Sequence, residues 1–205
     1  MLAAPVGFYR ALRTALDGDL PAADDLYQRA AAHMDRLGAW QYGAFTSVMG
    51  RFCLNVLRGR TADSIGELEL GLRHPLGSVL VAEPYALALA ASGRVAEARA
   101  VADRPRPIRR DMLWLFLTGV RGLLAIAIDD RERAESAYHE LLPFAARPVG
   151  AESGVLTLWP AAQILGDLAR YLGRPAARAH YEHALAVAEQ ANVVPWRAAA
   201  RNGLG

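Results

Sequence analysis

Two indoles, one guanidinium and one amide have the spacing of side chains that share a helix face. Trp114 and Arg121 are seven residues apart, and Trp159 and Gln163 are four apart. Residues separated by four or seven positions lie on the same face of an α-helix. Clustered aromatic and arginine side chains are common anchors for a bound partner. These four residues therefore predict a groove for an extended peptide or an amphipathic small molecule. The alternative is that the tryptophans simply pack between helices.

The segment most similar to a metal-binding motif contains His180, Glu182 and His183. The H-E-x-x-H motif places its two histidines four residues apart on one helix face, whereas these two are three apart. The helical pattern around them already explains them as exposed or capping residues. We therefore predict no metal site and no cofactor.

Residues suited to catalysis are sparse. The paired carboxylates Asp24-Asp25 and Asp129-Asp130 fall at expected helix starts, where negative charge complements the helix dipole. No G-x-S-x-G nucleophile motif occurs. The single cysteine, Cys53, lies in an apolar stretch and excludes an internal disulfide or a multi-cysteine metal site. We predict no catalytic residue, and we keep a small-molecule enzyme on the same scaffold as an alternative.

The charge of the chain does not favour nucleic-acid binding. All 23 basic residues are arginine, and the formal net charge is +2. The densest basic segment contains Arg104, Arg106, Arg109 and Arg110, but no aromatic residue is interleaved there for base stacking. We interpret this segment as a solvated connector or a patch that docks a partner, without direct contact to nucleic acid.

Composition and periodicity predict an all-α protein. Hydrophobic residues make up 53% of the chain, with alanine and leucine dominant, and no stretch alternates with period two long enough to indicate a sheet. The apolar spacing and the glycine and proline positions predict helices over residues 6–17, 21–37, 40–58, 62–72, 77–92, 95–103, 109–128, 131–147, 154–172, 175–191 and 195–203. Pro160 should kink the helix over 154–172 or mark its true start.

An internal repeat is visible in the turns and in the helices that follow them. Gly-Asp, Gly-Arg or Asp-Asp pairs recur at steps of 41, 34, 36 and 44 residues, the range of two-helix repeats. In three of the segments that follow, a tyrosine stands four residues after an alanine and three before a small or apolar residue. The three sets are Ala23, Tyr27 and Ala30; Ala134, Tyr138 and Leu141; and Ala177, Tyr181 and Ala184. Such spacing predicts the face on which the second helix of a repeat packs against its neighbour.

The apolar run over residues 112–128 does not predict a membrane span. It is short for that purpose and carries Arg121 near its centre. The first residues lack the basic segment of a secretory signal. We therefore expect a cytoplasmic protein without membrane association.

Three segments carry a family resemblance. They include YALALAASGRVAEARA over residues 85–100, AESAYHELLPFAARPV within 111–149, and LGDLARYLGRPAARAHYEHALAVAEQ within 165–196. These segments resemble the tetratricopeptide-like helical tails of large bacterial ATP-binding regulators that end in a LuxR-type DNA-binding domain, and of related nucleotide-cyclase-like and antibiotic-regulatory proteins. The resemblance implies a superhelix that senses an inducer or partner.

The sequence departs from those regulators in one large respect. It contains no lysine and therefore no G-x-x-x-x-G-K-[ST] phosphate loop, and no helix-turn-helix is recognisable. ATP and DNA functions are consequently not carried over. The sequence predicts a single domain over residues 1–205, hinged near 104–110. Its expected fold is a tetratricopeptide-like right-handed superhelix of about five helix pairs plus a terminal helix.

The expected function is that of a binding or interaction module in a bacterial regulatory system, without catalysis of its own. Its partner would be a protein, a peptide or an amphipathic small molecule. Besides the enzyme alternative, a structural scaffold remains open. In that case the apolar residues 193–204 would bury themselves against a second copy and form a homodimer.

Overall fold

The computed structural model of this chain describes residues 3–36, 40–73, 77–104 and 108–205. Within these ranges the chain forms helices joined by turns and one long loop. The strand-like pairing there is an isolated bridge between Pro148 and Pro160. The predicted all-α class is therefore confirmed. The predicted hinge centres on residues 105–107, which lie outside the described residues.

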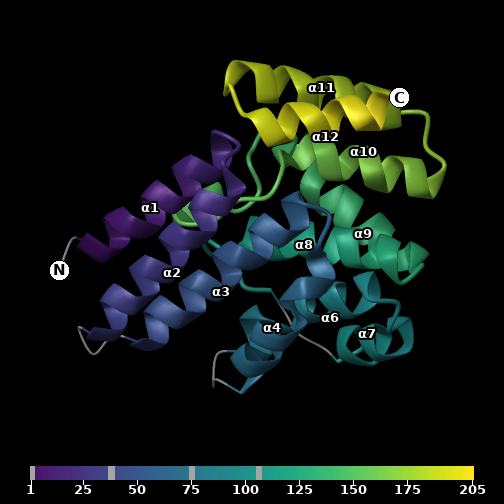
Figure 1. Ribbon diagram of the computed structural model, residues 1–205. Coiled ribbons are helices and arrows are strands. Elements are labelled where there is room, and N and C mark those ends of the chain that lie inside the picture. The colour runs from purple at the N-terminus through teal and green to yellow at the C-terminus, as the bar shows by residue number, and fades with distance from the viewer. Residues whose placement is uncertain (1–2, 37–39, 74–76, 105–107) are drawn as a thin grey trace.

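Helices that follow one another in the chain pack side by side (Figure 1). The N-terminal group consists of α1 (Ala3–Leu16), α2 (Leu20–Arg36) and α3 (Trp40–Leu57). The next group consists of the 3-10 helix η1 (Thr61–Ser64), α4 (Ile65–Leu72), α5 (Gly77–Leu80), α6 (Ala82–Ala91) and α7 (Val95–Ala102). The remainder comprises α8 (Trp114–Ala127), α9 (Arg131–Leu141), η2 (Leu142–Phe144), η3 (Ala151–Ser153), α10 (Ala161–Leu172), α11 (Ala177–Gln190) and α12 (Val194–Leu204).

The recurring tyrosines pack where the repeat pattern predicts helix contacts. Tyr27 of α2 and Tyr181 of α11 are fully buried. The ring of Tyr27 lies against Gly50 of α3, and the ring of Tyr181 lies against Gly166 of α10 and Gly203 of α12. A Cβ atom at any of these glycines would come within 2.5 Å of the ring. The missing side chains therefore give each tyrosine its space.

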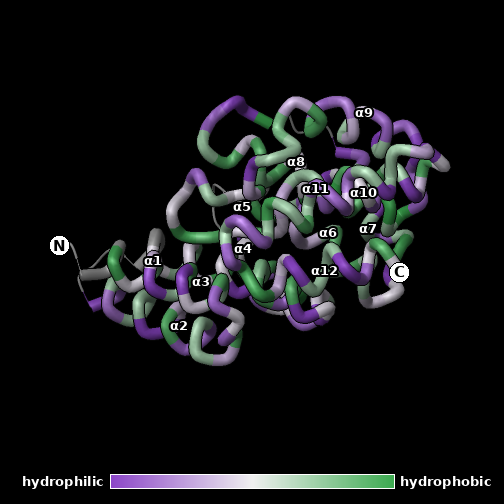
Figure 2. Tube along the Cα trace, turned by 90° about the horizontal axis from the view of Figure 1, so that it is seen from above, coloured by the Kyte–Doolittle hydropathy of each residue, from purple (hydrophilic) through white to green (hydrophobic). Residues whose placement is uncertain are grey.

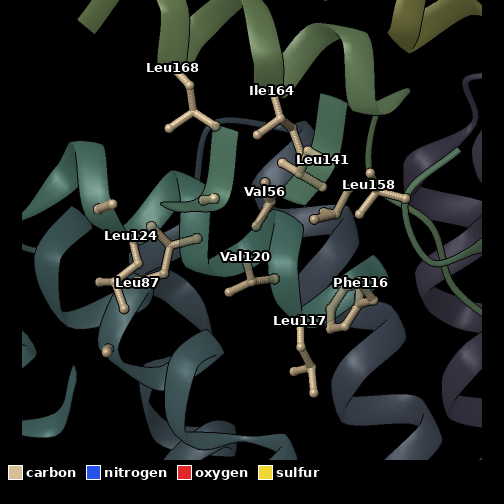
Figure 3. Close-up of a cluster of buried hydrophobic side chains, with 14 of the residues drawn as sticks. Val56, Leu87, Phe116, Leu117, Val120, Leu124, Leu141, Leu158, Ile164 and Leu168 are labelled. Atoms are coloured by element: carbon tan, nitrogen blue, oxygen red, sulfur yellow. The ribbon is translucent and has the colours of Figure 1, made fainter. Parts of the chain in front are cut away.

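Helix α8 forms the centre of the main hydrophobic core. Figure 3 shows Phe116, Val120 and Leu124 of α8 among buried side chains from α3, α6, α9 and α10. In Figure 2, hydrophobic and hydrophilic residues alternate along most of the helices, as expected when one face of each helix is buried. No helix in the described part of the chain is long and apolar enough to cross a membrane.

The segment between α9 and α10 is a partly buried loop in a region where the sequence predicts helix over much of its length. Helix α9 ends at Leu141 ahead of Pro143, and α10 begins at Ala161 directly after Pro160. The predicted end of the helix over 131–147 and the predicted start of the helix over 154–172 are therefore wrong. Pro160 does mark a helix start, as one of the two expectations for it requires. Gly150 and Gly154 adopt φ values of 97° and 68°, which prevent a continuous α-helix between the two prolines and leave only the short 3-10 helix η3 between them.

This loop folds back on itself, and its residues Val149 and 156–158 are buried. The Val149 N–H donates to the carbonyl oxygen of Trp159 at 3.0 Å, and the Leu158 N–H donates to that of Val149 at 2.8 Å. The Tyr27 hydroxyl of α2 donates to the carbonyl oxygen of Val155 at 2.6 Å, and the Trp196 indole N–H of α12 donates to that of Leu158 at 2.7 Å. The loop thus joins the first helices to the last.

Candidate functional site

The four residues of the predicted groove lie in separate environments, beginning with Trp114 at the start of α8. Its side chain is 8% exposed, and its ring centroid lies 5.2 Å from that of Phe144. The guanidinium carbon of Arg110 lies 4.8 Å above the indole. Trp114 borders a hollow of about 220 Å³, which is also lined by Asp111, Met112, Leu115, Phe144, Arg147 and Glu152.

Arg121 serves as a link between two helices. Its Nε and Nη2 atoms donate to Oε1 of Glu83 on α6, at 2.9 and 2.5 Å. The Glu83 side chain is buried and the Arg121 side chain is mostly buried. Removing one partner of a buried ion pair is strongly destabilising, so this pair contributes to holding α6 against α8.

Trp159 and Gln163 do not share a helix face, because α10 begins only at Ala161. Trp159 is partly buried and packs at the edge of two hydrophobic clusters. Gln163 is 6% exposed, and its amide nitrogen donates to Oδ1 of Asp167 at 3.4 Å. Its amide oxygen has no hydrogen-bond partner among the described residues. The spacing argument for this pair is therefore wrong, and the four-residue groove stays a prediction.

A larger cavity lies elsewhere, between α2, α3, α4 and the residue before α6. Its volume is about 470 Å³, within the range of small-molecule sites. Eleven residues line it: Gln28, Ala31, Ala44, Phe45, Ser47, Val48, Arg51, Glu67, Leu70, Gly71 and Val81. Most of this lining is apolar, and the polar residues Gln28, Ser47, Arg51 and Glu67 come from three different helices.

Small residues account for the space in this cavity. Ala31 of α2, Ala44 of α3 and Gly71 of α4 carry little or no side chain. Phe45 and Val48 of α3 contribute larger apolar side chains to the lining. Ser47 is a buried polar residue in the lining. The walls therefore combine an apolar surface with a few oriented polar groups, which is the composition of a ligand pocket.

Arg51 joins the three helices at the polar edge of the cavity. Its Nε atom donates to Oδ1 of Asp24 on α2 at 2.7 Å, and its Nη1 atom donates to Oε1 of Glu67 on α4. Gln28 donates from its amide nitrogen to the other oxygen of Asp24 at 3.2 Å. Burial disfavours the charged guanidinium, but the hydrogen bond to Asp24 and the charges of Glu67 and Asp24 outweigh burial and raise the pKa of Arg51.

The paired carboxylates have different environments. Asp24 lies beyond the first turn of α2 and binds Arg51, so its predicted place at the helix start is wrong. Asp130 caps α9 by accepting from the backbone N–H of Arg133 at 2.9 Å. Asp129 accepts from the Tyr171 hydroxyl at 2.7 Å. The structure therefore gives a cap at Asp130 and tertiary contacts at Asp24 and Asp129.

A second hollow, of about 460 Å³, lies beside α8, α10 and α11. It is lined by Leu123, Ile126, Ala127, Asp167, Arg170, Tyr171 and Tyr181. The Tyr181 hydroxyl donates to Oδ1 of Asp167 at 2.7 Å. Burial raises the pKa of Asp167, although the bonds from Tyr181 and Gln163 and the charge of Arg170 act in the opposite direction. The Asp167 carboxylate thus already accepts hydrogen bonds from side chains of α10 and α11.

Of the two histidines in the candidate metal motif, His180 has a structural contact. Nε2 of His180 lies 2.9 Å from the Tyr138 hydroxyl oxygen. Burial and the neighbouring His183 lower the pKa of His180, which favours the neutral ring. No group of three or more histidine, cysteine, aspartate or glutamate side chains in the described ranges is arranged to hold a metal ion.

Cys53 is buried, as its apolar stretch favours, and burial raises the pKa of its thiol well above the usual range. The apolar C-terminal residues proposed for dimerisation are also occupied within the chain. Val193 and Trp196 are buried and pack with Leu16 and Trp159. A homodimer formed through residues 193–204 would therefore have less exposed apolar surface to bury than the sequence suggests.

Sequence reasoning did not identify the residues of the large cavity. One signal was present, because Arg51 is the only charged residue between Trp40 and Leu57, in a segment otherwise rich in apolar residues. A lone guanidinium in such a helix needs a buried partner or a polar edge. Its partners Asp24 and Glu67 are 27 and 16 residues away, so spacing alone does not reveal the cluster.

No protein-family model, no curated protein and no solved structure matches this chain. The function is therefore inferred from the cavity and its charges.

Proposed function

We propose that this chain is a helical-repeat binding module that holds a small amphipathic molecule between α2, α3 and α4. The observation that carries the proposal is the cavity of about 470 Å³, with apolar walls and a polar edge formed by Gln28, Ser47, Arg51 and Glu67. Ligand pockets of this size are usually apolar with a few fixed polar groups. The polar groups at this edge are suited to orienting a ligand.

The proposal includes a tetratricopeptide-like arrangement of the helix pairs and a role in a bacterial regulatory system. The repeat spacing and the tyrosines packed on glycines support the arrangement. The regulatory role rests on the resemblance of the three segments to regulator tails. A ligand in the cavity would touch α2, α3 and α4 together, and α4 also contacts α6. Binding would therefore favour one arrangement of these helices. That arrangement would change the surface that the module presents to a partner.

The test is titration of the purified chain with Nile red, an uncharged apolar dye that fluoresces in apolar sites. We expect saturable binding of one dye per chain. Replacing Ala44 by tryptophan should abolish it, because the larger side chain enters the cavity. Replacing Ala96, an exposed alanine of α7 away from the cavity, by tryptophan is the matched control and should leave binding unchanged. Equal dye binding by both variants, or no saturable binding by the original chain, would overturn the proposal.

A further inference from the structure

The charges at the polar edge of the large cavity indicate which end group its ligand carries. Two carboxylates, Asp24 and Glu67, are paired with one guanidinium, Arg51. This cluster therefore has a formal charge of −1 at neutral pH. The Glu67 side chain is 39% exposed and itself lines the cavity, so its charge acts directly on a ligand there.

Arg51 is poorly placed to receive an anionic ligand. It already donates to Asp24 and to Glu67, and both contacts connect α3 to neighbouring helices. A ligand carboxylate would have to displace one of these carboxylates, or sit beside both of them and be repelled. The cavity therefore disfavours fatty acids and similar anions, although an arginine lines it.

Three side chains at this edge also offer oxygen atoms that can accept a hydrogen bond from a ligand. Glu67 uses Oε1 for Arg51, and within the described residues its Oε2 atom accepts no hydrogen bond. Gln28 uses its amide nitrogen for Asp24, which leaves its amide oxygen, and Ser47 supplies a hydroxyl oxygen. An ammonium group has three donors and no acceptor, so it matches a set of carboxylate, amide and hydroxyl oxygens.

We propose that the ligand of this cavity is a small amphipathic amine, with its ammonium group at Glu67 and its apolar body against Phe45 and Val48. This inference rests on the proposed function and adds the class of ligand to it. Charge complementarity selects the amine, and the apolar lining selects the hydrocarbon body.

The test is displacement of bound Nile red by octylamine, octanol and octanoate at pH 7, which share one chain length and differ in the end group. Octylamine should displace the dye at about three- to tenfold lower concentration than octanol, and octanoate should be the weakest. Glu67→Gln should remove the preference for the amine. Glu69→Gln, on the exposed side of the same helix, is the matched control and should keep it.

A second measurement uses the original chain alone, in case Glu67→Gln disturbs the contact with Arg51. The preference for octylamine over octanol should shrink as sodium chloride is raised from 50 to 500 mM, because salt screens a partly exposed charge. Equal displacement by all three compounds, or tightest binding of octanoate, would overturn the amine while leaving the cavity as a binding site. Dye that does not bind saturably would overturn the proposed function as well.

Discussion

At the scale of single residues, two helical glycines differ in what an added side chain would meet. A Cβ atom at Gly50 of α3 would lie 2.2 Å from the ring of Tyr27, whereas one at Gly66 of α4 meets nothing within 4 Å. The ring of Tyr27 cannot easily move, because it is buried and its hydroxyl is bonded to the carbonyl oxygen of Val155. We therefore expect Gly50→Ala to destabilise the fold by about 1–3 kcal/mol through overpacking.

Gly66→Ala is the control for this prediction. Its backbone is helical and its position is exposed, so an alanine fits there. The substitution should stabilise the fold by about 0.4–1 kcal/mol, because alanine lowers the conformational entropy of the unfolded chain. Urea denaturation followed by circular dichroism measures both effects. Equal midpoints for the two variants would show that the close contact between Tyr27 and α3 does not constrain the fold.

At the scale of elements, the loop between α9 and α10 should contribute to stability as a core helix does. Leu158 is 0% exposed, and its backbone bonds to Val149 and to the Trp196 indole. We expect Leu158→Ala to lower the free energy of unfolding by about 2–5 kcal/mol, the cost of a cavity in a packed core. The control is Leu142→Ala in η2, where the side chain is 43% exposed and the change should stay within about 0.5 kcal/mol.

Guanidinium denaturation of the two variants decides between a packed loop and a loosely attached one. A packed loop requires the midpoint of Leu158→Ala to fall well below that of Leu142→Ala. If both midpoints match that of the original chain, the loop packs too weakly to join the first helices to the last.

The elements also show which parts of the fold the sequence predicts. Helices such as α2, α9 and α11 follow from their periodicity, and Tyr27 and Tyr181 were correctly placed on packed faces. The sequence does not predict the loop, because GVLTLW, over residues 154–159, is a short apolar run whose period does not separate helix from extended chain. Gly150 and Gly154 were the local signal against a helix there.

The candidate cavity could not be predicted from the sequence for a different physical reason. Its space depends on the relative positions of Ala31, Ala44 and Gly71, which come from three helices and have no common spacing. The Arg51 cluster is likewise formed only when α2, α3 and α4 pack together. Trp159 and Gln163 do not share a helix face for a local reason, since α10 begins at Ala161, after Trp159 and Pro160.

At the scale of the whole molecule, the loop connects helices that are far apart in the chain. In a linear repeat protein each unit touches only its neighbours, and distant units can unfold separately. Here the loop residue Val155 binds Tyr27 of α2, and the loop residue Leu158 binds Trp196 of α12. The turn after α1 also contacts α12, since a Cβ atom at Gly18 would lie 3.3 Å from Val194.

These contacts predict that the N-terminal and C-terminal helices unfold together, so a change in α12 should weaken α2. Trp196→Phe removes the indole hydrogen bond to Leu158 and part of a buried side chain, which should loosen the loop and, through Val155, its contact with Tyr27. Native-state hydrogen exchange measures the opening free energy of each helix. We expect amides of α2 and α10 to lose protection by the same amount in this variant. Protection that falls in α10 to α12 and stays unchanged in α2 would instead mean that the ends unfold independently, as they do in an open array of repeats.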